Sequence, residues 1–211
     1  MTKKSEQLEQ IQQKIEELQK LDANLYIFGA HKHKYQFNPC LTEKEIQTFE
    51  EENSIQLPSG YREFLLHIGN GGAGPYYGLE PLENGRFSDL DYKDPGQLID
   101  LSRPFPHTAA WNMDFETLPE EEENGFFEKY YDDEWAKGLL RISNYGCGTT
   151  MNLVVNGSEY GNIWVDDRCN EQGIYPDPFF DSENRLSFLQ WYEHWLDESI
   201  KEVMENHHAT S

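Results

Sequence analysis

The sequence has few basic residues for its length. Its 211 residues include 17 Lys and Arg against 39 Asp and Glu, which gives a formal net charge of −22. Proteins that bind DNA, RNA or an anionic membrane surface need basic side chains to contact phosphates. The charge balance therefore excludes unaided binding to nucleic acid or to a membrane surface.

Long hydrophobic runs and paired cysteines are also missing. The apolar runs are far shorter than the roughly 18 residues that a membrane-spanning helix needs, and the first residues lack the apolar segment of a secretory signal. The three cysteines, Cys40, Cys147 and Cys169, are too few, and odd in number, for a disulfide framework. We therefore expect a cytoplasmic protein.

The common motifs of catalytic and nucleotide-binding sites are missing as well. The sequence contains no GxxxxGKS or GxxxxGKT, no GxSxG, no HExxH and no paired CxxC. Residues Gly69–Gly74 read GNGGAG, which matches the dinucleotide-binding pattern, but that motif must follow a strand and open a helix. Here a helical pattern precedes it, so we interpret it as a glycine-rich helix stop. We expect neither enzymatic activity nor a cofactor.

Two weaker candidates for chemistry involve histidine and cysteine. His31 and His33 would lie on one face of a strand, but no carboxylate or thiol follows closely, and we do not expect a metal site. Cys147 lies between two glycines, as a nucleophile on a sharp turn would, but a thiol nucleophile needs a positioned histidine. His107 or His194 would reach it only through the fold. We interpret Cys147 as a small buried residue at the start of a strand.

The N-terminal residues differ from the rest in charge and predict a helix. Residues 1–40 carry six basic and five acidic groups, whereas residues 41–211 carry 11 basic and 34 acidic groups. Apolar residues recur at spacings of three and four over residues 3–21, which predicts an amphipathic helix that is too short for a coiled coil. We expect it to pack on the body of the protein, and a partner or dimer helix is the alternative. Its apolar positions are Leu8, Ile11, Ile15 and Leu18.

Two further helices are predicted before the glycine-rich stop. Thr42 and Glu45 match the capping box that opens many helices. Pro58 suits the first turn of the next helix. Four apolar residues of that helix are spaced as one buried face: Tyr61, Phe64, Leu65 and Ile68.

The second half of the chain shows strand patterns. Residues 139–142 and 151–155 are apolar runs, and residues 162–165 form a third. Asn156 and Gly157 are typical of a hairpin turn between the last two. This predicts antiparallel strands.

The remaining elements are helical. A short helix is expected at residues 97–101. Ser187 and Gln190 match a cap for a last helix, and the tail from Asn206 onward is expected to be frayed. Helices, then strands, then a helix is the order of an α+β fold.

An acidic strip rich in aromatic residues lies in the middle of the chain. Residues 114–134 hold ten carboxylates and a single lysine. A solvated loop that aids solubility is one interpretation. The other is a docking surface for a basic protein, because carboxylates speed the encounter of opposite charges and aromatic residues supply buried anchors. The candidate binding residues of this strip are Glu120, Glu121, Glu122, Glu123, Tyr130, Tyr131, Asp132, Asp133 and Glu134.

Asp166 and Asp167 form a second candidate for partner binding. With Glu159 they are also candidates for holding a hard cation. Two acids at the end of a strand are more often solvated or paired with a neighbouring base, here Arg168.

The phrase LPSGYREFLLHIGNGGAGPYYGLEPL at residues 57–82 resembles the opening of the SUKH superfamily, which includes Smi/Knr-type cell-wall regulators and bacterial immunity proteins. Three later phrases are similar to segments of the same superfamily: DLSRPFPHTAAWN, LLRISNYGCGTTMNLVVNGSEYGNIWVDDR and FLQWYEHWLDE. The resemblance covers residues 42–198. Two segments lie outside the resemblance: residues 1–41, which we interpret as a helix and connector, and residues 199–211, which we interpret as a helix end with a frayed tail.

The resemblance implies an α+β fold with a twisted, mainly antiparallel sheet flanked by helices, to which this chain adds its N-terminal amphipathic helix. It implies an immunity protein that binds and blocks a toxin domain, often a nuclease. Such toxins tend to be basic, and a chain of charge −22 is complementary to them. A housekeeping regulatory or scaffold protein, as in the cell-wall regulator branch, is the alternative. Both interpretations are non-catalytic.

Overall fold

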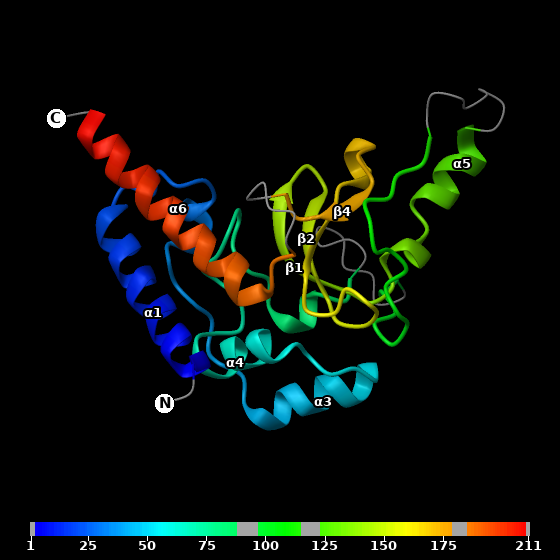
Figure 1. Ribbon diagram of the computed structural model, residues 1–211, viewed down its shortest axis with the longest axis horizontal. Helices are drawn as coiled ribbons and strands as arrows, with labels where there is room; N and C mark the ends of the chain where they lie inside the picture. Colours follow the sequence, from blue (N-terminus) through cyan, green and yellow to red (C-terminus); the bar gives the residue numbers. More distant parts are fainter. Residues whose placement is uncertain (1–2, 88–96, 115–122, 179–184, 210–211) are drawn as a thin grey trace.

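The computed structural model describes residues 3–87, 97–114, 123–178 and 185–209 (Figure 1). The broad order, helices first, then strands and a last helix, is the one expected from the sequence, and the structure adds short elements that were not predicted. In chain order they are α1 (Lys3–Leu21), α2 (Ala30–His33), α3 (Glu43–Asn53), α4 (Ser59–His67), η1 (Leu82–Asn84), α5 (Glu123–Tyr130), η3 (Asp133–Ala136), β1 (Leu139–Gly146), β2 (Thr149–Val154), β3 (Ile163–Asp166), η4 (Arg168–Asn170), β4 (Ile174–Pro176) and α6 (Phe188–Ala209).

The four strands form one antiparallel sheet in the order β1-β2-β3-β4 (Figure 1). The loop that contains Asn156 and Gly157 joins β2 to β3, which confirms the predicted hairpin. Met151 lies opposite Val165, and Val165 lies opposite Tyr175. Because side chains alternate along a strand, these three residues share one face of the sheet. The predicted α+β fold is confirmed.

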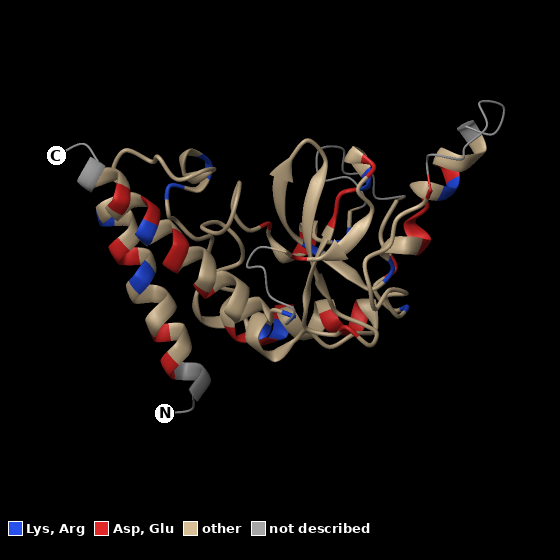
Figure 2. Ribbon diagram, turned by 45° about the horizontal axis from the view of Figure 1, so that its top comes forward, with Lys and Arg blue, Asp and Glu red and all other residues tan. Residues whose placement is uncertain are grey.

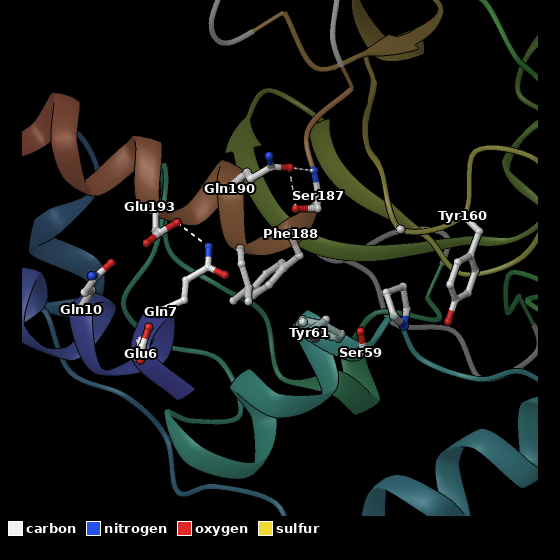
Figure 3. A pocket seen from close by; sticks show the side chains of 14 residues that line it. Glu6, Gln7, Gln10, Ser59, Tyr61, Tyr160, Ser187, Phe188, Gln190 and Glu193 are labelled. Carbon is white, nitrogen blue, oxygen red and sulfur yellow. Dashed lines mark hydrogen bonds between the residues drawn. The ribbon is translucent and has the colours of Figure 1, made fainter. Parts of the chain in front are cut away.

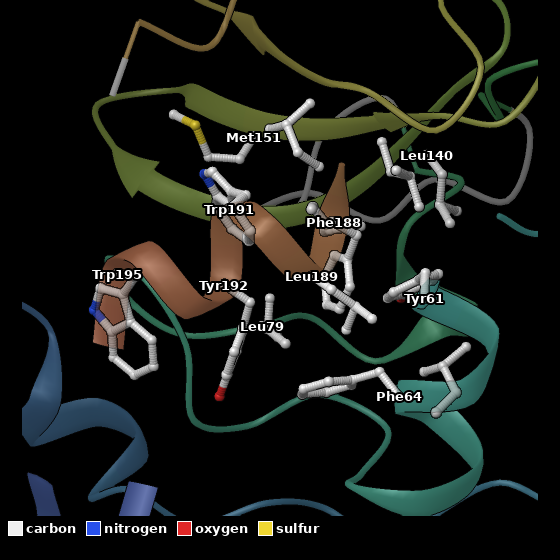
Figure 4. Packing of buried hydrophobic residues seen from close by; sticks show 14 of the residues in the cluster. Tyr61, Phe64, Leu79, Leu140, Met151, Phe188, Leu189, Trp191, Tyr192 and Trp195 are labelled. Carbon is white, nitrogen blue, oxygen red and sulfur yellow. The ribbon is translucent and has the colours of Figure 1, made fainter. Parts of the chain in front are cut away.

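Helices α4 and α6 cover this first face with aromatic side chains (Figure 4). The Phe64 ring of α4 is fully buried, and its centroid lies 5.1 Å from that of Phe188 and 4.9 Å from that of Tyr192. The Tyr192 hydroxyl donates to the backbone oxygen of Ala73, 2.8 Å away. The predicted helical face of α4 is therefore the centre of the core.

The second face of the sheet is covered by aromatic residues from the middle of the chain. Trp164 is next to Val165 and so points to the opposite side. The centroid of its ring lies 4.8 Å from that of Phe105. Trp111 and Trp135 stack with centroids 4.6 Å apart, which brings η3 onto this face. The sheet is thus packed on both sides, by different parts of the chain.

Helix α1 packs along α6, as predicted for a helix that belongs to the body (Figure 3). The two helices run in the same direction, because Gln7 bonds Glu193 and Lys14 pairs with Asp197 at 2.6 Å. All four predicted apolar positions of α1 are buried. The capping box of α3 is also confirmed, since the Thr42 hydroxyl accepts from the Glu45 amide.

Two local predictions were wrong. Residues 97–101 are not helical, because Leu98 forms a bridge with Phe87 and the Ile99 amide donates to Arg86. Residues 206–209 are helical rather than frayed, since α6 continues to Ala209. The apolar stripe of α6 reaches as far as the buried Val203, and this contact supports the last turns.

Acidic residues lie on helices at both ends of the molecule (Figure 2). They do not gather on one face alone. The distribution of acidic residues therefore does not single out one surface as a binding site.

Replacing Ile11 by Ala tests whether α1 belongs to the core. Ile11 is fully buried, and Ile→Ala changes in cores cost about 2–5 kcal/mol of unfolding free energy. Urea denaturation of Ile11→Ala and of the exposed-site control Gln13→Ala measures this. If the two variants unfold at the same urea concentration, α1 does not contribute to the core.

Candidate protein-binding surface

A buried ion pair joins β3 to the predicted acidic strip. The Arg168 guanidinium binds both oxygens of Asp166, at 2.9 Å from Nε and 2.8 Å from Nη2, and both residues are buried. Its Nη1 donates to the backbone oxygens of Tyr130 at 3.1 Å and Asp132 at 2.9 Å. The guanidinium thus fixes the backbone where α5 ends and η3 begins.

The charge of Asp166 is stabilised in place. Burial by itself would raise the pKa of this carboxyl group, because burial disfavours the charged form. The hydrogen bonds and charge of Arg168, with the charge of Arg141, outweigh burial and hold the pKa of Asp166 below its ordinary value. Asp166 is therefore ionised at neutral pH and pairs with Arg168. Pairing with Arg168 was one of the interpretations given in the sequence analysis.

The segment from Tyr131 to Glu134 lies on the surface next to this pair. The Tyr131 hydroxyl donates to the Arg168 backbone oxygen at 3.3 Å. Asp132 is exposed and caps η3 by accepting from the Glu134 amide at 2.8 Å. Asp133 is half-buried, and burial raises the pKa of its carboxyl group. Glu134 is exposed and pairs with Lys137.

Not every predicted binding residue reaches the surface. Tyr130 and Asp166 are buried and bond within the protein, so neither side chain is available to a partner in this structure. Glu120, Glu121 and Glu122 lie outside the described residues. Glu123 is the first residue of α5.

Asp167 is separated from the strip although it is next to Asp166. Its carboxylate accepts from the Thr149 hydroxyl at 2.7 Å and from the Asn170 side chain at 2.6 Å. Thr149 is on the face of the sheet that carries Met151. The side chains of Asp166 and Asp167 therefore form their hydrogen bonds on opposite faces of the sheet. Glu159 pairs with Arg185 instead of joining them.

The histidine and cysteine candidates have other positions than predicted. His31 and His33 lie in helix α2, not on a strand, and burial lowers the pKa of His33 to about 4. Cys147 is exposed in the turn between β1 and β2, where Gly146, Cys147 and Gly148 all have positive φ. The expectation of a buried Cys147 was wrong, because a turn that needs three such residues projects beyond the strands.

A cavity of about 690 Å³ opens between α1, α4 and α6 (Figure 3). Its wall contains Glu6, Gln7, Gln10 and Glu193, with Tyr160 from the loop between β2 and β3. Within the described part of the chain, no group of three or more His, Cys, Asp or Glu side chains is placed to hold a metal ion. No helix among these residues is long and apolar enough to cross a membrane.

An exposed aromatic cluster was missed by the sequence analysis. Phe28, Tyr77 and Tyr145 are 50%, 37% and 48% exposed, and Phe28 lies within 5.6 Å of both other rings, centroid to centroid. The residues come from three separate segments with no shared periodicity. Only the fold brings them together.

Comparison with known protein families gives a match. The model of the SMI1 / KNR4 family (SUKH-1) matches residues 40–192, which is more than two thirds of the chain. No curated protein and no solved structure matches. The matched region begins just before α3 and ends within α6, so α1 and the last turns of α6 lie outside it.

Replacing Asp166 by Asn tests the buried pair. Asparagine leaves the Arg168 charge buried without its counterion, which typically costs about 3–5 kcal/mol. The exposed Glu128→Gln on α5 is the control. Urea denaturation measures both variants, and a wild-type midpoint for Asp166→Asn would contradict the assigned role.

The pH dependence of this effect follows from the lowered pKa of Asp166. A carboxyl group whose pKa is lower in the folded state stabilises the fold at every pH above its pKa in the unfolded chain, which is about 3.9 for Asp. This contribution disappears as the pH falls through the pKa of the folded state. The loss of unfolding free energy in Asp166→Asn relative to wild type is therefore expected to be the same at about pH 7 as at about pH 5.5, because both values lie above the unfolded pKa. A difference that changes over this interval would mean that another group, such as a histidine, controls the effect.

Proposed function

The chain belongs to the SMI1 / KNR4 family (SUKH-1), and from this membership we propose that it is an immunity protein. In this proposal it binds a basic toxin domain, such as a nuclease domain. It blocks the toxin without catalysing a reaction. Membership alone fits a regulatory protein of the cell-wall regulator type equally well. The single observation that favours immunity is the net charge of −22.

Charge complementarity supports a basic toxin as the partner. A nuclease needs a positive surface because its substrate is a polyanion. An acidic protein that covers this surface competes with the substrate through the same electrostatic attraction. The proposed inhibition is steric and electrostatic, and needs no cofactor.

The surface at Tyr131–Glu134 is suited to bind such a partner. Its backbone is already fixed by Arg168, which lowers the cost of ordering it on binding. Its exposed groups combine carboxylates with the Tyr131 ring, which is a frequent type of residue at interface hot spots. We include residues 120–123 in the proposed surface on the basis of their charge.

A protection experiment separates immunity from regulation. Each basic toxin-like domain encoded in the source genome is expressed in a test host, with and without this chain. Rescue of growth by this chain, together with formation of a stable complex, supports immunity. If no such domain is bound or blocked, and deletion of the gene impairs growth when no toxin is present, the regulatory alternative replaces it.

Neutralising Glu120, Glu121, Glu122 and Glu123 to Gln tests electrostatic attraction by the strip. We expect slower association with the toxin domain and a weaker dependence of the association rate on salt. The matched control removes the same number of charges at the other end of the molecule, by changing Glu9, Glu16, Glu17 and Glu205 to Gln. Stopped-flow association at several salt concentrations gives both quantities. Equal rates for the two variants would show that the strip has no special part in association.

A further inference from the structure

We propose that a pocket on the first face of the sheet accepts an arginine side chain of the protein partner. The pocket is formed by Tyr76, Tyr145 and Tyr175 around the carboxylates of Asp167 and Asp177. That the arginine belongs to a toxin domain rests on the proposed function. The pocket is a second contact area, on the opposite side of the sheet from the acidic strip.

The pocket occupies the part of the first face that α6 leaves uncovered. Trp191 of α6 packs against Met151 (Figure 4), and its indole Nε1 donates to Asp177 at 2.7 Å, where the pocket begins. The volume is about 320 Å³, at the lower end of the range of roughly 300–1,000 Å³ for ligand pockets. This size suits one side chain rather than a folded segment. The described residues that line it are Tyr76, Tyr145, Thr149, Met151, Val165, Asp167, Asn170, Tyr175, Asp177 and Pro178.

Asp167 is held in position with its second oxygen facing the pocket residues. Thr149 and Asn170 both donate to Oδ1 of Asp167. Oδ2 accepts from the Tyr175 hydroxyl at 3.2 Å. The Cys169 thiol also donates to Oδ1, at 3.7 Å. Each carboxylate oxygen has about two acceptor positions, so Oδ2, which accepts from Tyr175, has room for a further N–H bond. A carboxylate fixed by its neighbours in this way is pre-organised for a cation.

The walls of the pocket are aromatic and continue onto the surface. The ring centroids of Tyr76 and Tyr145 are 4.7 Å apart and the rings meet edge to face. Tyr145 also belongs to the exposed cluster with Phe28 and Tyr77. Exposed aromatic groups that contact one another are typical of protein interfaces, where Tyr is enriched among the residues that dominate binding. Tyr145 therefore links the pocket to this exposed cluster, which would contact the partner beside the bound arginine.

The local electrostatics favour a cation. Burial raises the pKa values of the Tyr76 and Tyr175 hydroxyls, and the neighbouring Asp177 and Asp167 raise them further. The described residues that line the pocket include two carboxylates and neither Lys nor Arg. The Lys32 ammonium lies 5.9 Å from the centroid of the Tyr77 ring, and neither residue lines the pocket.

Arginine fits these walls better than lysine does. Its planar guanidinium stacks on aromatic rings and donates several N–H bonds in fixed directions. Lysine is a strongly hydrated point charge that would gain less from the rings. The combination of tyrosine rings with a fixed carboxylate therefore selects a guanidinium.

A titration without any toxin tests the pocket directly. N-acetyl-arginine amide is added to the isotope-labelled protein, and amide NMR shifts are compared with those for N-acetyl-citrulline amide, which has nearly the same shape but no charge. We expect shifts around Tyr145, Thr149 and Asp167 with arginine alone, at millimolar affinity, and their loss in Asp167→Asn. Equal shifts with citrulline, or none near the pocket, would overturn the proposal.

Dissociation of a toxin complex gives the second test. Tyr145→Ala is expected to raise the dissociation rate by about tenfold or more, as for a hot-spot residue. Tyr160→Ala is the control, because Tyr160 is similarly exposed but lines the cavity beside α1. If wild type binds the toxin and Tyr145→Ala dissociates at the wild-type rate, the pocket proposal fails and the immunity proposal stands. If wild type binds no toxin, the immunity proposal fails and the arginine titration alone decides the pocket.

Discussion

The buried Arg168 guanidinium sets a constraint on which both candidate surfaces depend. A charge inside the protein must be neutralised and its N–H donors must be bonded. Asp166 supplies the opposite charge, and the backbone oxygens of Tyr130 and Asp132 accept the remaining bonds. The same contacts fix the backbone where α5 ends and η3 begins, within the acidic strip. They also hold the backbone on both sides of Asp167, so that the Asp167 side chain points to the other face of the sheet.

The two surfaces would contribute in different ways to one binding event. Exposed carboxylates act over several ångströms and mainly affect how fast a basic partner arrives. A pocket with aromatic walls acts at contact and mainly affects how long the partner stays. Residues from the acidic strip and from the pocket meet near η4, because Tyr131 bonds Arg168 while Asn170 bonds Asp167. A partner large enough to wrap this edge of the sheet would reach both.

Much of the fold was predictable because its signals are local. The stripe of α1, the cap at Thr42 and the turn at Asn156 each lie within a few residues and were confirmed. The candidate surfaces depend instead on contacts between distant residues, such as Arg168 with Tyr130 and Tyr145 with Phe28. No spacing in the sequence encodes these contacts. For the same reason the pattern of acidic and aromatic residues placed Tyr130 and Asp166 among the binding residues, although both are buried.

The central claim is that a basic toxin domain binds the edge of the sheet near η4. Hydrogen–deuterium exchange of the chain, alone and with the toxin domain that it blocks, tests this claim most directly. We predict slower exchange on binding at residues 131–136, 145–149 and 167–177, with unchanged exchange along α1. Slower exchange confined to α1 and the C-terminal half of α6 would contradict the account, and would place the partner at the other end of the molecule.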